Sequence, residues 1–142
     1  MKAAVRGPTG TAHRLLVIDD EPDITRLIEA AARAIGLEVR SINDTNYFEK
    51  ALAAFQPTVI LLDVSMPDRD GVELIAHLSK GNYSGKIAIM SGTDARYIQM
   101  SSAIARVKGL RVAGTLAKPF RMQALKDLLT KLTSDSPEAP VG

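Results

Sequence analysis

Two runs of apolar residues without polar alternation end in carboxylates. Leu15 to Ile18 is followed by Asp19 and Asp20, and Val59 to Leu62 is followed by Asp63. A short apolar run of this kind is typical of a strand covered on both faces, as at the centre of a parallel sheet. In such sheets ligands bind beyond the carboxyl ends of the strands. The pattern therefore predicts two central strands that present acids at one sheet edge.

The rest of the pattern predicts three more strands and five helices. Alternating apolar and polar residues from Glu38 to Ile42 are typical of a strand near a sheet edge. Ile87 to Ser91 is a further buried run, and Leu110 to Leu116 is expected to form the last strand. Apolar residues at helical spacing predict helices at Pro22 to Ile35, Phe48 to Phe55, Gly71 to Leu78, Ala95 to Lys108 and Met122 to Leu132.

Residues with capping chemistry mark the expected ends of these helices. The acids Asp19 to Glu21 stand where they can bind the free N–H groups of the first helix. Asn43 to Thr45 can do the same for the second helix, and Asp94 for the fourth. Gly36 and Gly109 are expected to end the first and fourth helices, because glycine tolerates the left-handed conformation of a helix end.

The predicted fourth helix has the least regular apolar pattern. Ile98 and Ala105 are expected to face the core, with Met100 and Ile104 as further candidates. Tyr97 near its start is expected to serve packing or to contact a partner. The packing of this helix is therefore the part of the fold that the pattern defines least.

Strands that alternate with helices predict an α/β fold with right-handed crossovers and a doubly wound parallel sheet. We expect a five-stranded, flavodoxin-like sheet in the order 2-1-3-4-5 with helices on both faces. This order makes strands one and three neighbours, so that Asp19 and Asp20 meet Asp63 in one crevice. Residues 14–133 are expected to form the domain, with 1–13 as a flexible leader and 134–142 as a disordered tail or linker.

Composition narrows the classes of function. The 142 residues include no cysteine, which excludes disulfide scaffolds, thiolate metal sites and cysteine nucleophiles and fits a cytoplasmic protein. No apolar run approaches the roughly 20 residues of a membrane helix. The net charge of +2 is spread over interspersed acids and bases, so nucleic-acid binding is not expected. His13 and His77 stand apart from the acids and are expected to face solvent.

The predicted sheet also brings Ser91 and Lys118, at the ends of the last two strands, toward the acids. Packed carboxylates raise one another's pKa unless a cation neutralises them. Mg²⁺ prefers such oxygen ligands and usually keeps several waters. A carboxylate can also accept a phosphoryl group and form an aspartyl phosphate, whose added charge an ammonium and a hydroxyl would stabilise. The pattern therefore indicates Mg²⁺-dependent phosphoryl chemistry at a carboxylate.

Four short motifs in this order resemble the receiver domains of the response regulators of two-component signalling. Together they span about residues 14–133, nearly the whole chain. No single motif is specific, whereas the set of four in order is. The motifs are Val17 to Glu21, Leu61 to Asp63 followed by Met66, Pro67, Asp68 and Gly71, Met90 to Gly92, and Lys118 to Phe120.

The resemblance implies that Asp63 is phosphorylated by a histidine kinase or a histidine phosphotransfer protein. It also implies that Asp20, Asp63 and the backbone carbonyl of Ser65 bind Mg²⁺, or Mn²⁺ in its place, with Asp19 acting through water. The implied protein is no enzyme toward an outside substrate. It accepts a phosphoryl group and loses it again by reaction with water, a step that Ser65 is expected to influence.

The resemblance also assigns the residues around the phosphoryl group. Ser91, Gly92 and Lys118 would contact it, and the peptide bond between Lys118 and Pro119 would be cis, which proline makes feasible. Many receivers carry an aromatic switch residue three positions before the lysine, on the last strand. Thr115 stands there in this chain, so the usual aromatic switch is missing.

The output is expected to be a downstream protein that binds the face of the fourth helix and last strand. Pairing of two copies through the fourth and fifth helices is a further expectation of the resemblance. The segment between Ser91 and Lys118 is longer than in chemotaxis-type receivers and is similar to receivers attached to cyclic-di-GMP phosphodiesterase domains. No room for such a domain follows Thr133, so a stand-alone receiver is expected.

Two other functions compete with the phosphoacceptor switch. One is a protein-interaction module that keeps the receiver fold but works without phosphorylation, which the threonine at position 115 favours. The other is an Mg²⁺-dependent phosphohydrolase acting on an outside substrate. Asp68 and Asp70 would be available as its second acid, but no segment of the chain is suited to form a substrate-selecting cap.

Overall fold

The computed structural model describes residues 13–65, 71–92 and 95–134. Several sequence predictions fall outside these residues: the leader up to residue 12, the motif Met66 to Asp68, the acid Asp70, the cap Asp94 and the tail from residue 135. In the described part of the chain, no helix is long and apolar enough to cross a membrane.

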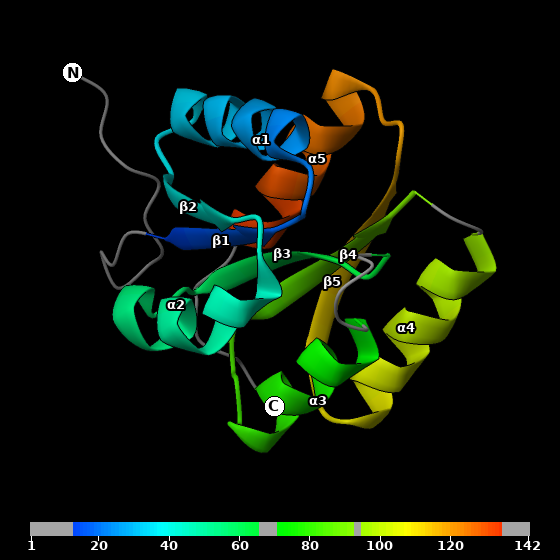
Figure 1. Cartoon of the computed structure of the whole chain (residues 1–142). Coiled ribbons are helices and arrows are strands. Elements are labelled where there is room, and N and C mark those ends of the chain that lie inside the picture. Colours follow the sequence, from blue (N-terminus) through cyan, green and yellow to red (C-terminus); the bar gives the residue numbers. More distant parts are fainter. Residues whose placement is uncertain (1–12, 66–70, 93–94, 135–142) are drawn as a thin grey trace.

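Five parallel strands form the sheet at the centre of the molecule (Figure 1). Their order is β2-β1-β3-β4-β5, which confirms the predicted arrangement. The pairs Leu16↔Ile60 and Ile18↔Leu62 set the register of the two central strands. The strands are β1 (Arg14–Ile18), β2 (Glu38–Ile42), β3 (Val59–Asp63), β4 (Lys86–Ser91) and β5 (Arg111–Ala117).

Helices cover both faces of this sheet. In Figure 1, α1 and α5 lie on one side of it and α2, α3 and α4 on the other. A short 3₁₀ helix at Thr45–Tyr47 leads into α2. The helices are α1 (Pro22–Ala34), α2 (Phe48–Phe55), α3 (Gly71–Lys80), α4 (Ala95–Val107) and α5 (Met122–Thr133).

A hydrophobic core lies on each face of the sheet. The two apolar runs supply the centre of both cores, because successive side chains of a strand point to opposite faces. Leu16 and Leu62 pack under α2, α3 and α4. Val17 and Leu61 pack under α1 and α5. All four are fully buried, and burial of a side chain of this size contributes about 1.5–3 kcal/mol. The missing alternation in the sequence thus follows from a sheet covered on both sides.

Two glycines end helices as predicted. Gly36 follows α1 with a φ of 84°, and Gly109 follows α4 with a φ of 89°. Beyond them, Leu37 donates a hydrogen bond to Ala32 O and Leu110 to Ala105 O, each 3.0 Å long. These contacts bind carbonyls that a helix end leaves free.

The prediction that acids cap α1 through their side chains is wrong. Glu21 is the N-cap residue, but its side chain makes no capping hydrogen bond. Its carboxylate instead accepts a hydrogen bond from Lys118, which lies at the end of a distant strand. Asp44 does act as a cap, since its side chain accepts from Asn46 N, but it caps the 3₁₀ helix before α2.

The predictions for Met100 and His13 are wrong as well. Met100 is 46% exposed, while Ser101 and Ser102 take the buried positions of α4 beside Ile98. Their hydroxyls have no hydrogen-bond partner among the described residues. His13, which precedes β1, is buried, and its Nδ1 lies 3.1 Å from the hydroxyl of Thr58, the residue before β3.

His77 and Ile104 are each partly buried. His77 is partly exposed, and its ring meets the edge of Phe48 with 5.6 Å between centroids. Ile104 packs partly buried against the core, as expected for a further inward-facing candidate.

Candidate functional site

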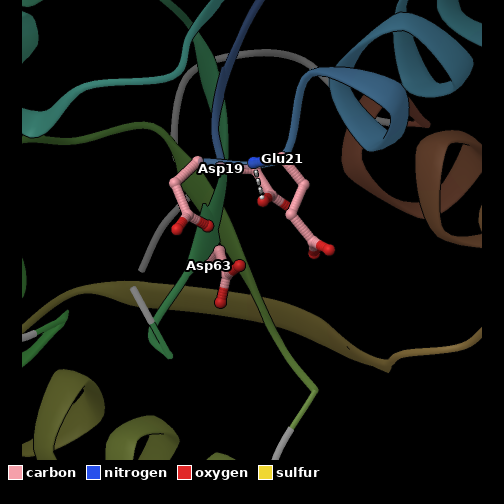
Figure 2. Close-up of side chains that lie close together, drawn as sticks. Asp19, Glu21 and Asp63 are labelled. Atoms are coloured by element: carbon pink, nitrogen blue, oxygen red, sulfur yellow. Dashed lines mark hydrogen bonds between the residues drawn. The ribbon is translucent and has the colours of Figure 1, made fainter. Parts of the chain in front are cut away.

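The carboxyl ends of four strands meet at one edge of the sheet. Asp19 directly follows β1, Asp63 ends β3, Ser91 ends β4 and Lys118 directly follows β5. Figure 2 shows Asp19 and Glu21, from the link between β1 and α1, beside Asp63 at the end of β3. The strand order explains the meeting, since β1 and β3 are neighbours although about 45 residues separate their ends.

The ammonium group of Lys118 lies among three carboxylates. Its Nζ is 2.9 Å from Asp19 Oδ2, 2.9 Å from Asp63 Oδ2 and 2.6 Å from Glu21 Oε1. The side chains of Asp19 and Asp63 are almost completely buried, whereas that of Glu21 is 58% exposed. Lys118 is therefore the counter-charge of two carboxylates that water hardly reaches.

The second oxygen of Asp63 is held by Ser65. Asp63 Oδ1 accepts hydrogen bonds from the Ser65 backbone N–H at 2.8 Å and from its hydroxyl at 2.6 Å. The Gly92 N–H in turn donates to the Ser65 hydroxyl at 3.4 Å. Both oxygens of Asp63 thus have fixed partners, so the orientation of this carboxylate is defined.

Asp19 is fixed by its own turn and by Asn43. Its Oδ1 accepts from the Glu21 N–H at 2.9 Å, and its backbone carbonyl accepts from the Asn43 side chain at 2.8 Å. Burial raises the pKa of Asp19 from 3.8 to about 6, against the lowering effect of its hydrogen bonds to Lys118 and Glu21. The raised pKa of Asp19 therefore reflects mainly its removal from water, and the nearby Asp63 carboxylate raises it by a smaller amount.

The pKa of Lys118 is displaced in the opposite sense. Burial alone would lower it, but the hydrogen bonds to Glu21, Asp63 and Asp19 outweigh that effect and hold the pKa above its ordinary value. Lys118 is therefore a charged ammonium throughout the physiological range of pH.

A cleft of about 560 Å³ opens over this cluster. Asp20, Asp63, Ser65, Gly92 and Lys118 line it, with Glu21, Ile24 and Pro119. Ser91, by contrast, is completely buried at the end of β4.

The acids of the cluster also offer ligand atoms for a cation. One carboxylate oxygen from each of Asp19, Asp20, Glu21 and Asp63 lies within 4.8 Å of the others. The structure thus brings the predicted acids together with Ser65, Gly92 and Lys118 in one accessible site.

Sequence reasoning missed the contact of Glu21 with Lys118 and the support of Asp19 by Asn43. Glu21 stands 97 residues from Lys118 in the chain, so no local pattern reports their approach. The signal for Asn43 is weak but present: it directly follows β2, which pairs with β1, and its side chain also bonds Thr25.

Thr115, the predicted switch position, is exposed on β5 opposite Ile89 of β4. Its neighbour Leu116 points into the core with α5. The Lys118–Pro119 peptide bond is cis, as expected from the sequence. Lys118 N also donates to Ser91 O at 2.9 Å, so the ends of β4 and β5 are tied together.

Comparison with known proteins agrees with this architecture. The chain is 29% identical over 121 residues to the transcriptional regulatory protein TrcR of Mycobacterium tuberculosis, covering 82% of the chain and 43% of TrcR. It is 28% identical over 131 residues to the response regulator protein PilR of Pseudomonas aeruginosa, covering 89% of the chain and 28% of PilR. The chain therefore spans less than half the length of these curated relatives.

A solved structure matches over nearly its full length. The response regulator from Colwellia psychrerythraea superposes with a TM-score of 0.75 at 27% sequence identity, covering 87% of the chain and 98% of that protein. The model of the response regulator receiver domain family matches residues 15–130, which include all four strand-end residues of the site. This chain belongs to the response regulator receiver domain family.

Proposed function

We propose that Asp63 accepts a phosphoryl group from a phosphohistidine of a histidine kinase or histidine phosphotransfer protein. An Asp63 carboxylate oxygen attacks phosphorus, the bond between phosphorus and the histidine nitrogen breaks, and the leaving imidazole takes up a proton. The observation that carries this proposal is the position of Asp63: it ends a buried strand, lines an open cleft and has Lys118 within 2.9 Å.

The donor set fits a hard divalent cation. Lys118 contributes one positive charge against four carboxylates whose ligand atoms lie within 4.8 Å, and oxygen ligands suit Mg²⁺. Asp20, Asp63 and the Ser65 carbonyl would hold Mg²⁺, or Mn²⁺ in its place, with Asp19 acting through water. When bound, the ion supplies neutralisation of the charge on the phosphoryl oxygens.

The remaining polar groups of the site bind and orient the phosphoryl group. The Gly92 N–H and the Lys118 ammonium line the cleft, and each would exchange a present hydrogen bond for one to a phosphoryl oxygen. Ser91 would join them by turning its buried hydroxyl toward the cleft. Ser65 donates two hydrogen bonds to Asp63 Oδ1, so we propose Oδ2, whose partner is Lys118, as the nucleophile. Water returns the protein to the unphosphorylated state, with no outside substrate involved.

The signal would leave the domain through the face made by α4 and β5. A phosphoryl group that pulls Ser91 and Lys118 inward shifts the population of this face between two states, and a downstream protein or a second copy would prefer one of them. We place this signalling in the cytoplasm. Thr115, exposed and non-aromatic, is the observation that favours the second candidate, an interaction module that works without phosphorylation.

The test is incubation with acetyl phosphate and Mg²⁺, followed by intact mass spectrometry. We expect the mass increase of one phosphoryl group, lost in Asp63→Ala and without Mg²⁺, and retained in the control Asp23→Asn on the surface of α1. No adduct, or an adduct that survives Asp63→Ala, refutes the proposal. If the unmodified domain binds its downstream protein as tightly as the phosphorylated domain, the interaction module is the better description.

A further inference from the structure

The exposed carboxylate of Glu21 makes the shortest of the three contacts of the Lys118 ammonium group. Glu21 Oε1 lies 2.6 Å from Lys118 Nζ, whereas the nearest oxygens of Asp19 and Asp63 lie at 2.9 Å. Glu21 also lines the cleft over Asp63. A carboxylate thus stands next to the ammonium group at the place where a phosphoryl group would enter.

The hydrogen-bond donors of Lys118 are fully used by these contacts. An ammonium group carries three N–H donors, and each of the three carboxylates accepts one of them. A phosphoryl oxygen that approaches Lys118 therefore has to take a donor from one of these carboxylates before the bond between phosphorus and Asp63 forms.

Burial decides which of the three contacts opens at the lowest cost. The side chains of Asp19 and Asp63 are 0% and 2% exposed, so each would lose its cation without gaining water. The side chain of Glu21 is 58% exposed, and water can solvate its carboxylate once it leaves Lys118. The contact between Glu21 and Lys118 is therefore the one that gives way.

The role of Glu21 at the start of α1 does not account for this contact. Glu21 is the N-cap residue of α1, but its side chain makes no capping hydrogen bond. A negative charge at this end of α1 suits the helix dipole, and a carboxylate that points into water would supply that charge equally well. Capping and the dipole thus do not explain why the carboxylate binds Lys118, which follows the distant strand β5.

We propose that Glu21 competes with the incoming phosphoryl group for the Lys118 ammonium and thereby slows the phosphorylation of Asp63. In the resting domain Glu21 holds one donor of Lys118. When the phosphoryl group enters the cleft, the carboxylate turns toward water and the donor passes to a phosphoryl oxygen. Glu21 forms no covalent bond and is a positioning residue that acts through Lys118. The inference rests on the proposed phosphoacceptor function of Asp63.

The first measurement is the rate at which acetyl phosphate phosphorylates the protein at saturating Mg²⁺, followed by intact mass spectrometry. Glu21→Gln keeps the size of the side chain and removes its charge. This variant should react about two- to fivefold faster than the wild type, the change expected when one exposed ion pair no longer holds Lys118. The control Asp23→Asn removes an exposed charge from the first turn of α1, away from the cleft lining, and should react at the wild-type rate.

The second measurement needs neither Mg²⁺ nor a phosphoryl donor. NMR spectra of the ¹⁵N-labelled lysine side chains report how fast the ammonium hydrogens exchange with water. The Lys118 hydrogens, bound by three carboxylates, should exchange faster in Glu21→Gln than in the wild type and at an unchanged rate in Asp23→Asn.

The third measurement separates this role from metal binding. A carboxylate oxygen of Glu21 lies within 4.8 Å of ligand atoms of the other acids, so the geometry also permits a contact with the cation. As a competitor for Lys118 rather than a metal ligand, Glu21→Gln should weaken Mg²⁺ binding less than Asp20→Asn does.

Several outcomes overturn the inference. A phosphorylation rate of Glu21→Gln at or below that of the wild type would show that Glu21 does not compete, and so would equal ammonium exchange in the two proteins. An equal acceleration in Asp23→Asn would reveal a general effect of charge. Mg²⁺ binding weakened as strongly as in Asp20→Asn would make Glu21 a metal ligand.

The same experiments distinguish this inference from the proposed function. A wild type that forms no adduct refutes the phosphoacceptor role of Asp63 and this inference with it. An adduct that forms equally fast on the wild type and on Glu21→Gln refutes the competition by Glu21 alone.

Discussion

Replacing Lys118 with methionine removes the ammonium group at the centre of the site while keeping most of the length and apolar character of the side chain. Asp19 and Asp63 would then remain buried next to each other without their shared cation. We expect the variant to fold with much lower stability at neutral pH in the absence of Mg²⁺.

The size of the loss follows from the two buried contacts. At 2.9 Å each pair attracts by about 6 kcal/mol for an effective dielectric constant of about 20, and most of this offsets the cost of removing the charges from water. Removing one partner of a buried ion pair typically costs about 3–5 kcal/mol, because the other charge stays uncompensated. The contact with the exposed Glu21 adds little to this figure.

Urea unfolding of the wild type, Lys118→Met and the control Lys126→Met measures the effect at pH 7 and pH 5, with and without Mg²⁺. Lys126 is exposed on α5, so its replacement should change the free energy of unfolding by less than about 0.5 kcal/mol. The loss in Lys118→Met should shrink at pH 5, below the pKa of about 6 to which burial raises Asp19, and on addition of Mg²⁺. A loss no larger than that of Lys126→Met at pH 7 would refute the role of Lys118 as a structural counter-charge.

Three further changes test other parts of the structure by urea unfolding. Because the fold raises the pKa of Asp19 from 3.8 to about 6, its charged form destabilises the fold above pH 6. The Mg²⁺-free wild type should therefore gain about 1.4 kcal/mol between pH 7 and pH 5 from this group, and an equal pH slope in Asp19→Asn would contradict this. Ser101→Ala should raise stability by about 1 kcal/mol, since the buried hydroxyl has no hydrogen-bond partner among the residues that the structure describes; a loss of stability would mean that the hydroxyl is bound. Gly71→Ala should cost about 1–3 kcal/mol because its Cβ would lie 2.5 Å from Val64 Cβ. Gly81→Ala, with no atom closer than 3.6 Å, is the control, and equal costs would contradict the argument.

The apolar runs before Asp19 and Asp63 predicted two central strands, and the alternation of strands with helices predicted the sheet order that the structure has. Their information is local: a strand covered on both faces needs uninterrupted apolar residues, and its end faces the crevice. The burial of Ser101 was not predictable in this way, because hydrophobic periodicity does not recognise a small polar residue as part of a core. The errors at His13 and Glu21 have another origin, since their partners lie 45 and 97 residues away.

The Ser101 and Ser102 hydroxyls of α4, which lack a hydrogen-bond partner in the described part of the chain, have a consequence for the exchange of backbone amide hydrogens. A helix that buries serine in place of leucine loses less hydrophobic free energy when it detaches from the sheet. The backbone amides of α4 should therefore exchange through local opening rather than through global unfolding. A helix with a low opening free energy responds to a small bias, since about 1.4 kcal/mol shifts a population ratio tenfold. Weak packing of α4 would then let a modest signal at the strand ends produce a large change in the surface that a partner meets.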